Sequence, residues 1–373
     1  MNYIFVNSST NIEYRVDLIC EFLMRQGHTV TVFASDYVHT KKIKRTAAEV
    51  PEHYSLVDTH PYKKNISLGR LYSHYKFSRD AFSEIKDLSA DVLYLIIPQN
   101  SNALIGKWYK KKHPQTRIVM DIVDMWPESL PVKGTGCFPF TLWAGIRNKN
   151  LKYADIVITE CRYYCEKLQP FLKNKKTAVI PWLKRYRPWN SIFENEDLSL
   201  SSTAEGRSVI RLCYLGAINN IIDISQISQL IRGLREHCQV ELHVIGLGEQ
   251  KERFLKESET SGAQVFDYGP IYDENEKQRI MDFCDFGLNI MRDIVCVGLS
   301  MKSIDYMAAG LPVINNLPGD SHSLVETNKI GVNWPASTEE ILEFRADRKK
   351  IRRLFETNFS HETLSRYWKL TGC

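Results

Sequence analysis

Apolar runs alternate with amphipathic stretches along the first half of the chain. The runs are Tyr3–Val6, Thr29–Phe33, Val92–Ile97, Arg117–Met120, Ile156–Ile158 and Ala178–Pro181. The stretches between them have helical spacing of apolar residues, as in Val16–Leu23. Continuous apolar strands separated by helices are typical of a parallel sheet that is covered on both faces. The pattern therefore predicts an α/β unit with a doubly wound sheet.

The alternation stops near Arg187 and starts again at about residue 209. Polar, turn-prone residues fill this interval, which indicates a linker over 187–208. Strand-like runs then return at Arg211–Leu215, Glu241–Ile245, Gln264–Phe266, Phe286–Ile290 and Val313–Ile314. We therefore expect two Rossmann-like domains, 1–186 and 209–350, with a ligand crevice between the carboxyl ends of their strands. Residues 351–373 have helical character, and we expect this helix to pack back toward the first domain.

Length and composition narrow the class of protein. The chain has 373 residues, 43% hydrophobic and 25% charged, which suits two globular domains. A formal net charge of +5 is too small to argue for nucleic acid and suits an anionic ligand or an anionic membrane face. The chain start has no signal-peptide pattern, and the nine cysteines are unevenly spaced. These features favour a cytoplasmic protein with reduced thiols.

The most informative segment runs from Gly298 to Ile314. A glycine-bearing turn opens a short helix, which ends at Gly310 and leads into an apolar strand. The N-terminus of a helix presents unpaired N–H groups and can hold a phosphate, and Lys302 lies in the first turn. Asp305 follows about one turn later and suits sugar hydroxyls. The alternative is an ordinary connection between a helix and a strand, with a glycine C-cap.

A second informative loop, Asp121–Ser129, follows a predicted buried strand. Trp126 is suited to stack on a sugar face, while Asp124 or Glu128 binds hydroxyl groups. The alternative is a capped helix start with Trp126 in the core. We favour the functional interpretation, because charges at the carboxyl end of a strand need solvent or a ligand.

Two weaker loops follow the first strand of each predicted domain. Ser8 and Ser9 are small polar residues that suit an acceptor hydroxyl, although such residues are also common in turns. Gly216 follows a strand in the second domain and suits a phosphate cradle of backbone N–H groups, as does Gly246. Neither glycine belongs to a GxGxxG fingerprint.

Two further loops of the second domain carry equally open signals. Asp267–Tyr272 suits the edge of a nucleotide base, or a turn without a function. Arg292 suits phosphate oxygens, although a solvated surface arginine is the ordinary expectation. No set of residues has the spacing of metal ligands or of a Ser/His/Asp catalytic group.

These segments together resemble the family-4 retaining glycosyltransferases of the GT-B fold. The resemblance is to bacterial enzymes of capsule, exopolysaccharide and O-antigen assembly in particular, and it covers most of the chain. It rests on Gly27–Val32, Asp124–Ser129, Tyr153–Ile158, Tyr214–Gly216, Val244–Glu249 and Asp305–Ile314. The last segment is the most specific of these.

The resemblance implies a hexosyltransferase that needs no metal and no cofactor. Its substrates would be a nucleotide diphosphate sugar and a glycan, or a polyprenyl-linked glycan, in cell-surface polysaccharide synthesis. With the loops above, it predicts donor contacts at Gly216, Asn219, Gly246, Pro270, Ile271, Gly298, Leu299, Ser300 and Asp305. It predicts acceptor contacts at Ser8, Ser9, Trp126 and Glu128, and catalytic roles for Asp124, Arg292 and Lys302.

The chain departs from the pattern of this family at the donor site. Many members have a glutamate at the position of Val297 and another at Asp305, and basic residues in the loop after Gly216, where this chain has Asn219 and Asn220. Lys302 with Arg292, or the Lys184–Arg185 pair, would supply the positive charge. Two alternatives stay open: an epimerase of sugar nucleotides with the same fold, and a non-catalytic partner subunit that resembles a glycosyltransferase.

A mixture of basic and aromatic residues in the first domain suits an anionic membrane surface. These residues lie in Lys107–Lys112 and in the region from Tyr72 to Phe82. A peripheral location on the inner face of the cell membrane is one interpretation, and a solvated run of charge is the other.

Overall fold

The chain forms two α/β units in the structure, a computed structural model that describes residues 1–63, 67–194 and 209–372. The first unit consists of Met1–Pro181 with Leu364–Cys373, and the second of Trp182–Thr363. Of the expected linker 187–208, residues 195–208 lie outside the described residues. The predicted fold class, two Rossmann-like units with doubly wound parallel sheets, is confirmed.

The first unit is built on a seven-stranded sheet with the order β5-β2-β1-β6-β7-β8-β9. All neighbouring strands in it are parallel. The strands are β1 (Asn2–Asn7), β2 (Thr29–Ser35), β5 (Tyr54–Val57), β6 (Val92–Ile97), β7 (Arg117–Ile122), β8 (Ile156–Thr159) and β9 (Lys176–Val179). A small hairpin, β3 (Tyr37–Val38) and β4 (Ile43–Lys44), follows β2. The apolar pattern does not predict this hairpin or β5, because these strands are short and partly exposed.

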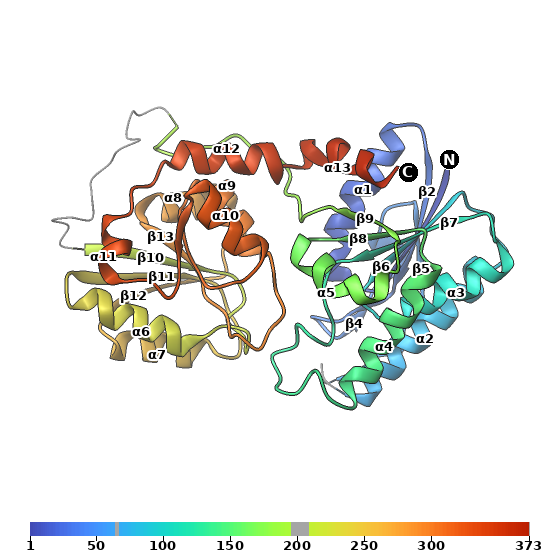
Figure 1. The fold of residues 1–373 in the computed structure, drawn as a ribbon, viewed down its shortest axis with the longest axis horizontal. Helices are drawn as coiled ribbons and strands as arrows, with labels where there is room; N and C mark the ends of the chain where they lie inside the picture. Colours follow the sequence, from blue (N-terminus) through green and yellow to red (C-terminus); the bar gives the residue numbers. More distant parts are fainter. Residues whose placement is uncertain (64–66, 195–208, 373) are drawn as a thin grey trace. The chain divides into compact units, whose positions relative to one another are not determined.

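Helices cover both faces of this sheet (Figure 1). On one face lie α2 (Leu68–Ile85), α3 (Asn102–Lys112), α4 (Phe140–Asn150) and α5 (Arg162–Leu172). On the other lie α1 (Glu13–Arg25) and α13 (Leu364–Thr371). A buried ion pair joins α1 to the middle of the sheet, because Arg15 Nε lies 2.9 Å from Asp121 Oδ2. Trp368 of α13 packs against Tyr3 and Tyr94, so the end of the chain belongs to the first unit.

The second unit has a six-stranded parallel sheet with the order β12-β11-β10-β13-β14-β15. Its strands are β10 (Val209–Leu215), β11 (Gln239–Ile245), β12 (Ala263–Gly269), β13 (Phe286–Asn289), β14 (Val313–Asn315) and β15 (Gly331–Asn333). Its helices are α6 (Ile224–Arg235), α7 (Lys251–Thr260), α8 (Glu274–Phe283), α9 (Met301–Ala308), α10 (Asp320–Asn328), α11 (Thr338–Glu343) and α12 (Arg348–Asn358). Helices α6 and α7 cover one face, and α8, α9 and α12 the other. Apolar residues at helical spacing explain this packing; in α6, Ile227, Ile231 and Leu234 are fully buried.

Candidate functional site

The strand order of the second unit reverses between β10 and β13. These strands pair only at Leu212–Phe286 and Cys213–Gly287, and they separate toward their carboxyl ends. The hydroxyl of buried Tyr306 fills the gap, where it accepts a hydrogen bond of 2.9 Å from the Leu215 N–H. In open α/β sheets, ligands bind outside the carboxyl ends of strands at such a reversal. We therefore expect a ligand site at the loops that follow β10 and β13.

Helix α9 begins at this reversal, as the sequence predicts. Ser300 is its N-cap, and the Ser300 Oγ accepts a 3.1 Å hydrogen bond from the Ser303 N–H. Within the described chain, the N–H groups of Met301 and Lys302 have no acceptor. The helix start therefore offers two backbone donors and a partial positive charge, which suit an anion.

A ladder of three asparagines, two of them fully buried, fixes the start of α9. Asn289, Asn315 and Asn333 are the last residues of three neighbouring strands and are paired in register. Asn289 Nδ2 donates to Asn315 Oδ1 at 2.8 Å, and Asn315 Nδ2 donates to Asn333 Oδ1 at 3.0 Å. Ser300 Oγ donates to Asn289 Oδ1 at 2.8 Å. The apolar pattern of the sequence does not predict this ladder, although each of three successive strands ends in an asparagine.

Lys302 lies against the ring of Tyr214, at the end of β10. Its Nζ lies 4.1 Å from the ring centroid and 2.9 Å from the hydroxyl oxygen. Burial lowers the pKa of Lys302 from 10.5 to about 7. Within the described residues no carboxylate forms an ion pair with it. An anion bound at the start of α9 would therefore stabilise the charged ammonium of Lys302, which the protein itself stabilises poorly.

The glycines of the neighbouring loops allow backbones to pack closely. A Cβ at Gly246 would lie 2.0 Å from Gly216 O, and one at Gly248 would lie 2.2 Å from Ile218 O. Gly216 itself has a φ of +111°, in the left-handed region that favours glycine. Gly216 N–H donates to Ile245 O, and Gly246 N–H donates to Gly269 O. Gly246 therefore allows the two loops to pack closely. The phosphate contact of this loop stays a prediction.

The other predicted donor residues lie on the same edge of the sheet. Asn219 accepts a hydrogen bond from the Ile221 N–H, and the Arg292 guanidinium donates to Asn220 O at 3.3 Å. Arg292 lines a pocket of about 300 Å³, whose other lining residues are Asn220, Ile222, Asp223, Ile224, Ser225, Gln250 and Arg253. Lys302 does not line this pocket. Pro270 and Ile271 follow β12 directly, beside the contact between Gly246 and Gly269.

The two positions that depart from the family pattern have clear environments. Val297 packs against the apolar cluster of Met291, Val295 and Leu317. Asp305 lies on α9 in an ion pair with Lys184, which is also 3.6 Å from Glu274. The Asp305 carboxylate therefore already has a cationic partner within the second unit.

In the first unit, the loop after β7 forms a compact turn around Trp126. Glu128 is held by the buried Arg147, with Nη2 to Oε1 at 2.6 Å. Arg147 also donates to Trp126 O at 2.8 Å. Burial raises the pKa of Asp124 above its ordinary value. No helix begins at Asp124, because the segment consists of turns up to α4.

Ser8 and Ser9 follow β1 at the same edge of the first sheet. Ser8 is buried, and its Oγ accepts a 3.3 Å hydrogen bond from Asn102. The Ser9 N–H donates to Asn7 Oδ1 at 3.1 Å. Both residues take part in local turn and packing contacts, and neither contacts Trp126 through a described hydrogen bond.

The described residues include neither a metal-binding cluster nor a membrane-spanning helix. They contain no group of three or more His, Cys, Asp and Glu side chains placed to hold a metal ion. None of their helices combines the length and the apolar character needed to cross a membrane.

The fold matches several solved structures over nearly its whole length. Sucrose-phosphate synthase from Thermosynechococcus elongatus matches with a TM-score of 0.68 and 13% identity, over 99% of this chain and 98% of that chain. The lipopolysaccharide outer core galactosyltransferase WaaB matches with a TM-score of 0.67 and 14% identity, over 99% of both chains. Anabaena HepE, solved with UDP and glucose, matches with a TM-score of 0.62 and 13% identity, over 99% of this chain and 98% of that chain.

The fold is that of the GT-B glycosyltransferases. The fold expected from the sequence resemblance is therefore confirmed. No family model and no curated protein matches the sequence.

Proposed function

We propose that this chain is a retaining glycosyltransferase of the family-4 type. It moves a hexose from a nucleotide diphosphate sugar to a glycan acceptor in the synthesis of a cell-surface polysaccharide. The observation that carries the proposal is the start of α9, where open backbone N–H groups and Lys302 lie at the strand reversal of the second unit. The bound UDP in HepE and the galactosyltransferase function of WaaB support this choice.

The chemistry follows from where charge develops. The acceptor hydroxyl attacks the anomeric carbon on the face from which the diphosphate leaves. The bond from that carbon to the diphosphate oxygen breaks, a glycosidic bond forms, and the hydroxyl proton passes to the leaving oxygen. Lys302 and the N–H groups of α9 stabilise the departing charge, with Arg292 as a second cation. In this proposal the cations and the helix start replace a metal ion.

Donor binding tests the first half of the proposal. Ligands that bind only the folded state stabilise it, by about 2.7 kcal/mol at 100 times the Kd. We expect one of UDP, GDP, dTDP or CMP, and its sugar conjugate, to raise the melting temperature in the presence of EDTA. Lys302→Met should remove most of this shift. If no nucleotide stabilises the protein, with or without Mg²⁺, the proposal is wrong.

Analysis of the reaction products distinguishes a glycosyltransferase from an epimerase and from a non-catalytic partner subunit. Sugar transfer to a glycan supports the proposal, with retained anomeric configuration read by NMR. Conversion of the donor sugar without an acceptor would identify an epimerase instead. Tight donor binding with neither transfer nor hydrolysis would favour a non-catalytic partner subunit, which the apolar Val297 keeps open.

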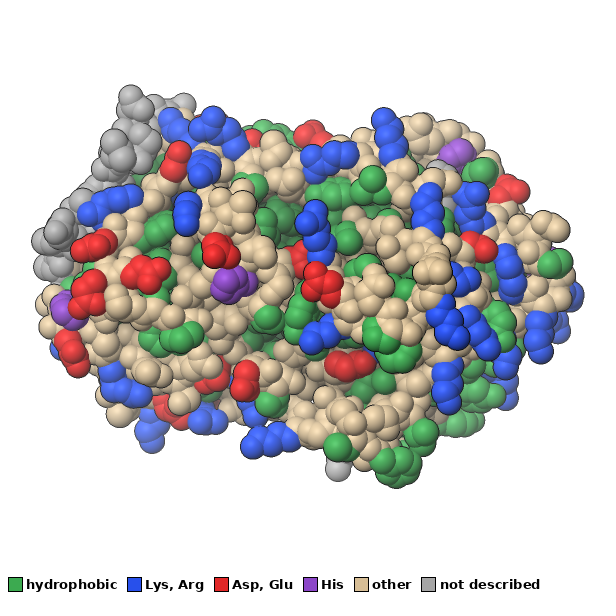
Figure 2. Space-filling view, viewed as in Figure 1, with side chains coloured by type: hydrophobic (Ala, Val, Ile, Leu, Met, Phe, Trp, Pro, Cys, Tyr) green, Lys and Arg blue, Asp and Glu red, His purple; other side chains and the backbone are tan. Residues whose placement is uncertain are grey.

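Peripheral membrane contact is a further part of the proposal. The lysines of α3 support it weakly, since Lys110 pairs with Asp155 and Lys112 with Asp87. Large apolar side chains at the start of α2 and just before α4 support it better: Leu68 is 84% exposed and Phe138 78%. Figure 2 shows apolar side chains gathered at the lower edge of the view, where Figure 1 places these helix ends. Flotation with anionic liposomes tests this contact, and Leu68→Glu should reduce the bound fraction; no binding by the unaltered chain would refute it.

A further inference from the structure

A cavity of about 440 Å³ lies at the amino edge of the first sheet. Three of its lining residues, Arg117, Ile156 and Lys176, are the first residues of β7, β8 and β9. These neighbouring strands are parallel, so their first residues lie together, at the edge opposite the predicted acceptor loops. Gly372, which follows α13, lines the same cavity, and all four residues belong to the first unit.

The charged side chains that line this cavity are mainly positive. Three cations line it: Lys110, Arg117 and Lys176. Asp155 is the one carboxylate among the described residues that line it, which gives the lining a formal charge of +2. Asp155 Oδ2 accepts hydrogen bonds from Lys110 Nζ at 2.9 Å and from the Ile118 N–H at 2.8 Å. Asp155 therefore balances Lys110, and the remaining positive charge belongs to Arg117 and Lys176.

Arg117 and Lys176 both approach Gly372. Arg117 Nη1 donates to Gly372 O at 2.6 Å, which uses one of the five N–H groups of the guanidinium. A Cβ at Gly372 would lie 2.5 Å from Lys176 Nζ, so the ammonium lies directly beside this glycine. Neither cation pairs with a carboxylate within residues 1–63, 67–194 and 209–372, and the Lys176 ammonium makes no hydrogen bond there. Two cations thus meet at a neutral residue, and an anion bound between them would be attracted to both.

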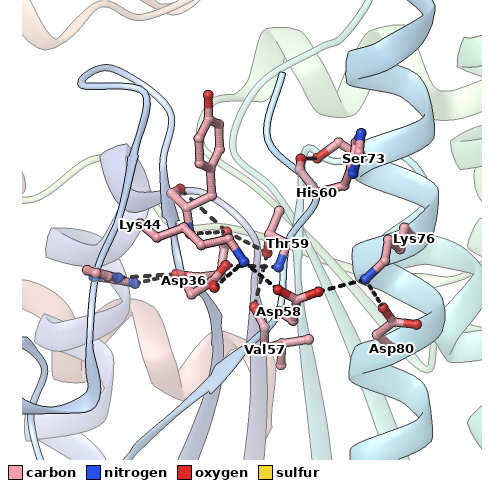
Figure 3. A network of polar contacts seen from close by, with 12 residues as sticks. Asp36, Lys44, Val57, Asp58, Thr59, His60, Ser73, Lys76 and Asp80 are labelled. Carbon is pink, nitrogen blue, oxygen red and sulfur yellow. Dashed lines mark hydrogen bonds and ion pairs between the residues drawn. The ribbon is translucent and has the colours of Figure 1, made fainter. Parts of the chain in front are cut away.

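Lysines in another part of the first unit are balanced by carboxylates (Figure 3). Asp58, just after β5, pairs with both Lys44 and Lys76, and each of these lysines has a second carboxylate partner. Lys176 has no such partner within the described chain. A solvated surface lysine would explain Lys176 alone. It would not explain why Lys176 and Arg117 lie together on the wall of one cavity.

The charge and the size of the cavity indicate which ligand it suits. A phosphate monoester carries a charge of about −1.5 to −2 near pH 7, which matches the formal charge of the lining. Clefts of about 300–1,000 Å³ hold small organic ligands, so the cavity is large enough for more than a phosphate group. Pro114, Gln115 and Ile156 form an uncharged part of its lining, which suits the organic part of such a ligand.

We propose that this cavity is a second ligand site, which binds a soluble phosphate monoester of about the size of a sugar phosphate. The inference goes beyond the proposed function, because the donor is proposed to bind in the second unit and the acceptor at the opposite edge of the first sheet. Arg117 and Lys176 donate to the phosphate oxygens, and the Gln115 amide binds hydroxyl groups of the ligand. The bound phosphate joins the starts of β7 and β9 to the residue that follows α13.

The test measures binding of glucose 6-phosphate, glucose and inorganic phosphate to the full chain by isothermal titration calorimetry at constant ionic strength. We expect glucose 6-phosphate to bind about 10- to 100-fold more tightly than glucose, the range for charge-assisted hydrogen bonds. Inorganic phosphate should compete with it. Lys176→Gln should weaken the binding of glucose 6-phosphate by a similar factor. Lys175→Gln is the matched control, because this neighbouring lysine does not line the cavity.

Lys302→Met separates this cavity from the predicted diphosphate site, and it should leave the binding of glucose 6-phosphate unchanged. If Lys302→Met removes the binding while Lys176→Gln does not, the phosphate binds in the second unit and the inference fails. Glucose 6-phosphate that binds no better than glucose would also overturn it. Vesicles that contain phosphatidate carry the same group on a lipid. If they bind through Lys176 while glucose 6-phosphate does not bind, the ligand is not a soluble metabolite and the proposal is wrong.

Discussion

The two units can be compared at the same place, the carboxyl edge of each parallel sheet, where different chemical groups form the surface. In each, a cation rests on an aromatic ring at the carboxyl ends of the strands: Lys302 on Tyr214, and Arg70 on Trp126. Around Lys302 the surface is made of backbone, from the start of α9 and from Gly216 and its neighbouring loops. Around Arg70 it is made of side chains from separate loops.

This difference between backbone and side chains agrees with the ligand proposed for each edge, the donor diphosphate in the second unit and the acceptor glycan in the first. A diphosphate is common to all nucleotide sugars, and backbone N–H groups with one lysine bind it without regard to the rest of the molecule. An acceptor glycan must be distinguished from many others, which requires side chains of particular shape and charge. We therefore expect changes near Lys302 to affect transfer to every acceptor, and changes near Arg70 to affect the choice among them.

Lys302→Met is the substitution with the largest expected effect on activity. It removes the cation proposed to stabilise the leaving diphosphate, and removal of one such group typically lowers kcat about 10²- to 10³-fold. The loss should be the same for every acceptor tested in a transfer assay with saturating donor. Lys256→Met, an exposed lysine of α7, is the control and should leave kcat unchanged. Full activity of Lys302→Met would falsify the assignment.

Glu128→Ala tests whether this residue of the first unit supports structure or binds the acceptor. The change leaves the buried Arg147 without its carboxylate, and hydrogen bonds to charged groups contribute about 1.5–3 kcal/mol. We expect a clear fall in melting temperature. Asp124→Asn is the comparison; it should change the KM for the acceptor more than the stability. A large change in the acceptor KM for Glu128→Ala at unchanged stability would support the predicted acceptor contact of Glu128.

Gly246→Ala tests the backbone construction of the second edge. The added Cβ would lie 2.0 Å from Gly216 O, so the two loops must separate, and such overpacking typically costs about 1–3 kcal/mol. We expect a lower melting temperature and weaker binding of the donor nucleotide. Gly136→Ala in the first unit is the control, since a Cβ there meets nothing within 4 Å. Equal effects of the two substitutions would mean that close packing of these loops is unimportant.

The periodicity of apolar residues predicted most of the strands and helices. A long buried strand such as Val92–Ile97 is a continuous apolar run, and helices such as α6 have amphipathic spacing. The short strands β3, β4 and β5 have no such signal, because they are only partly buried and their pairing depends on distant segments. Residues 351–373 contain two helices, α12 and α13, which belong to different units.

The site could be predicted only where one segment carries it. The start of α9 was readable because its cap, its lysine and its glycines are adjacent in sequence. The partner of Asp305 was not, because Lys184 lies far away in the chain. The contact of Arg70 with the Trp126 ring was not predicted for the same reason, because α2 and the loop after β7 lie far apart in the chain.

The smallest expected effect is a pH dependence that belongs to Lys302 alone. Its pKa is about 7 in the folded protein and near its ordinary 10.5 when unfolded. Between these values the unfolded chain binds more protons, so this residue makes the ligand-free protein more stable as the pH rises through that window. Melting temperatures at pH 7 and pH 9 should therefore rise more, or fall less, for the unaltered protein than for Lys302→Met. Bound donor nucleotide should shrink this difference, because its phosphates favour the charged ammonium and keep the pKa high. Titrations common to both proteins cancel in the comparison. Equal responses to pH would therefore mean that the pKa of Lys302 is not lowered, and that the two edges differ less than we infer.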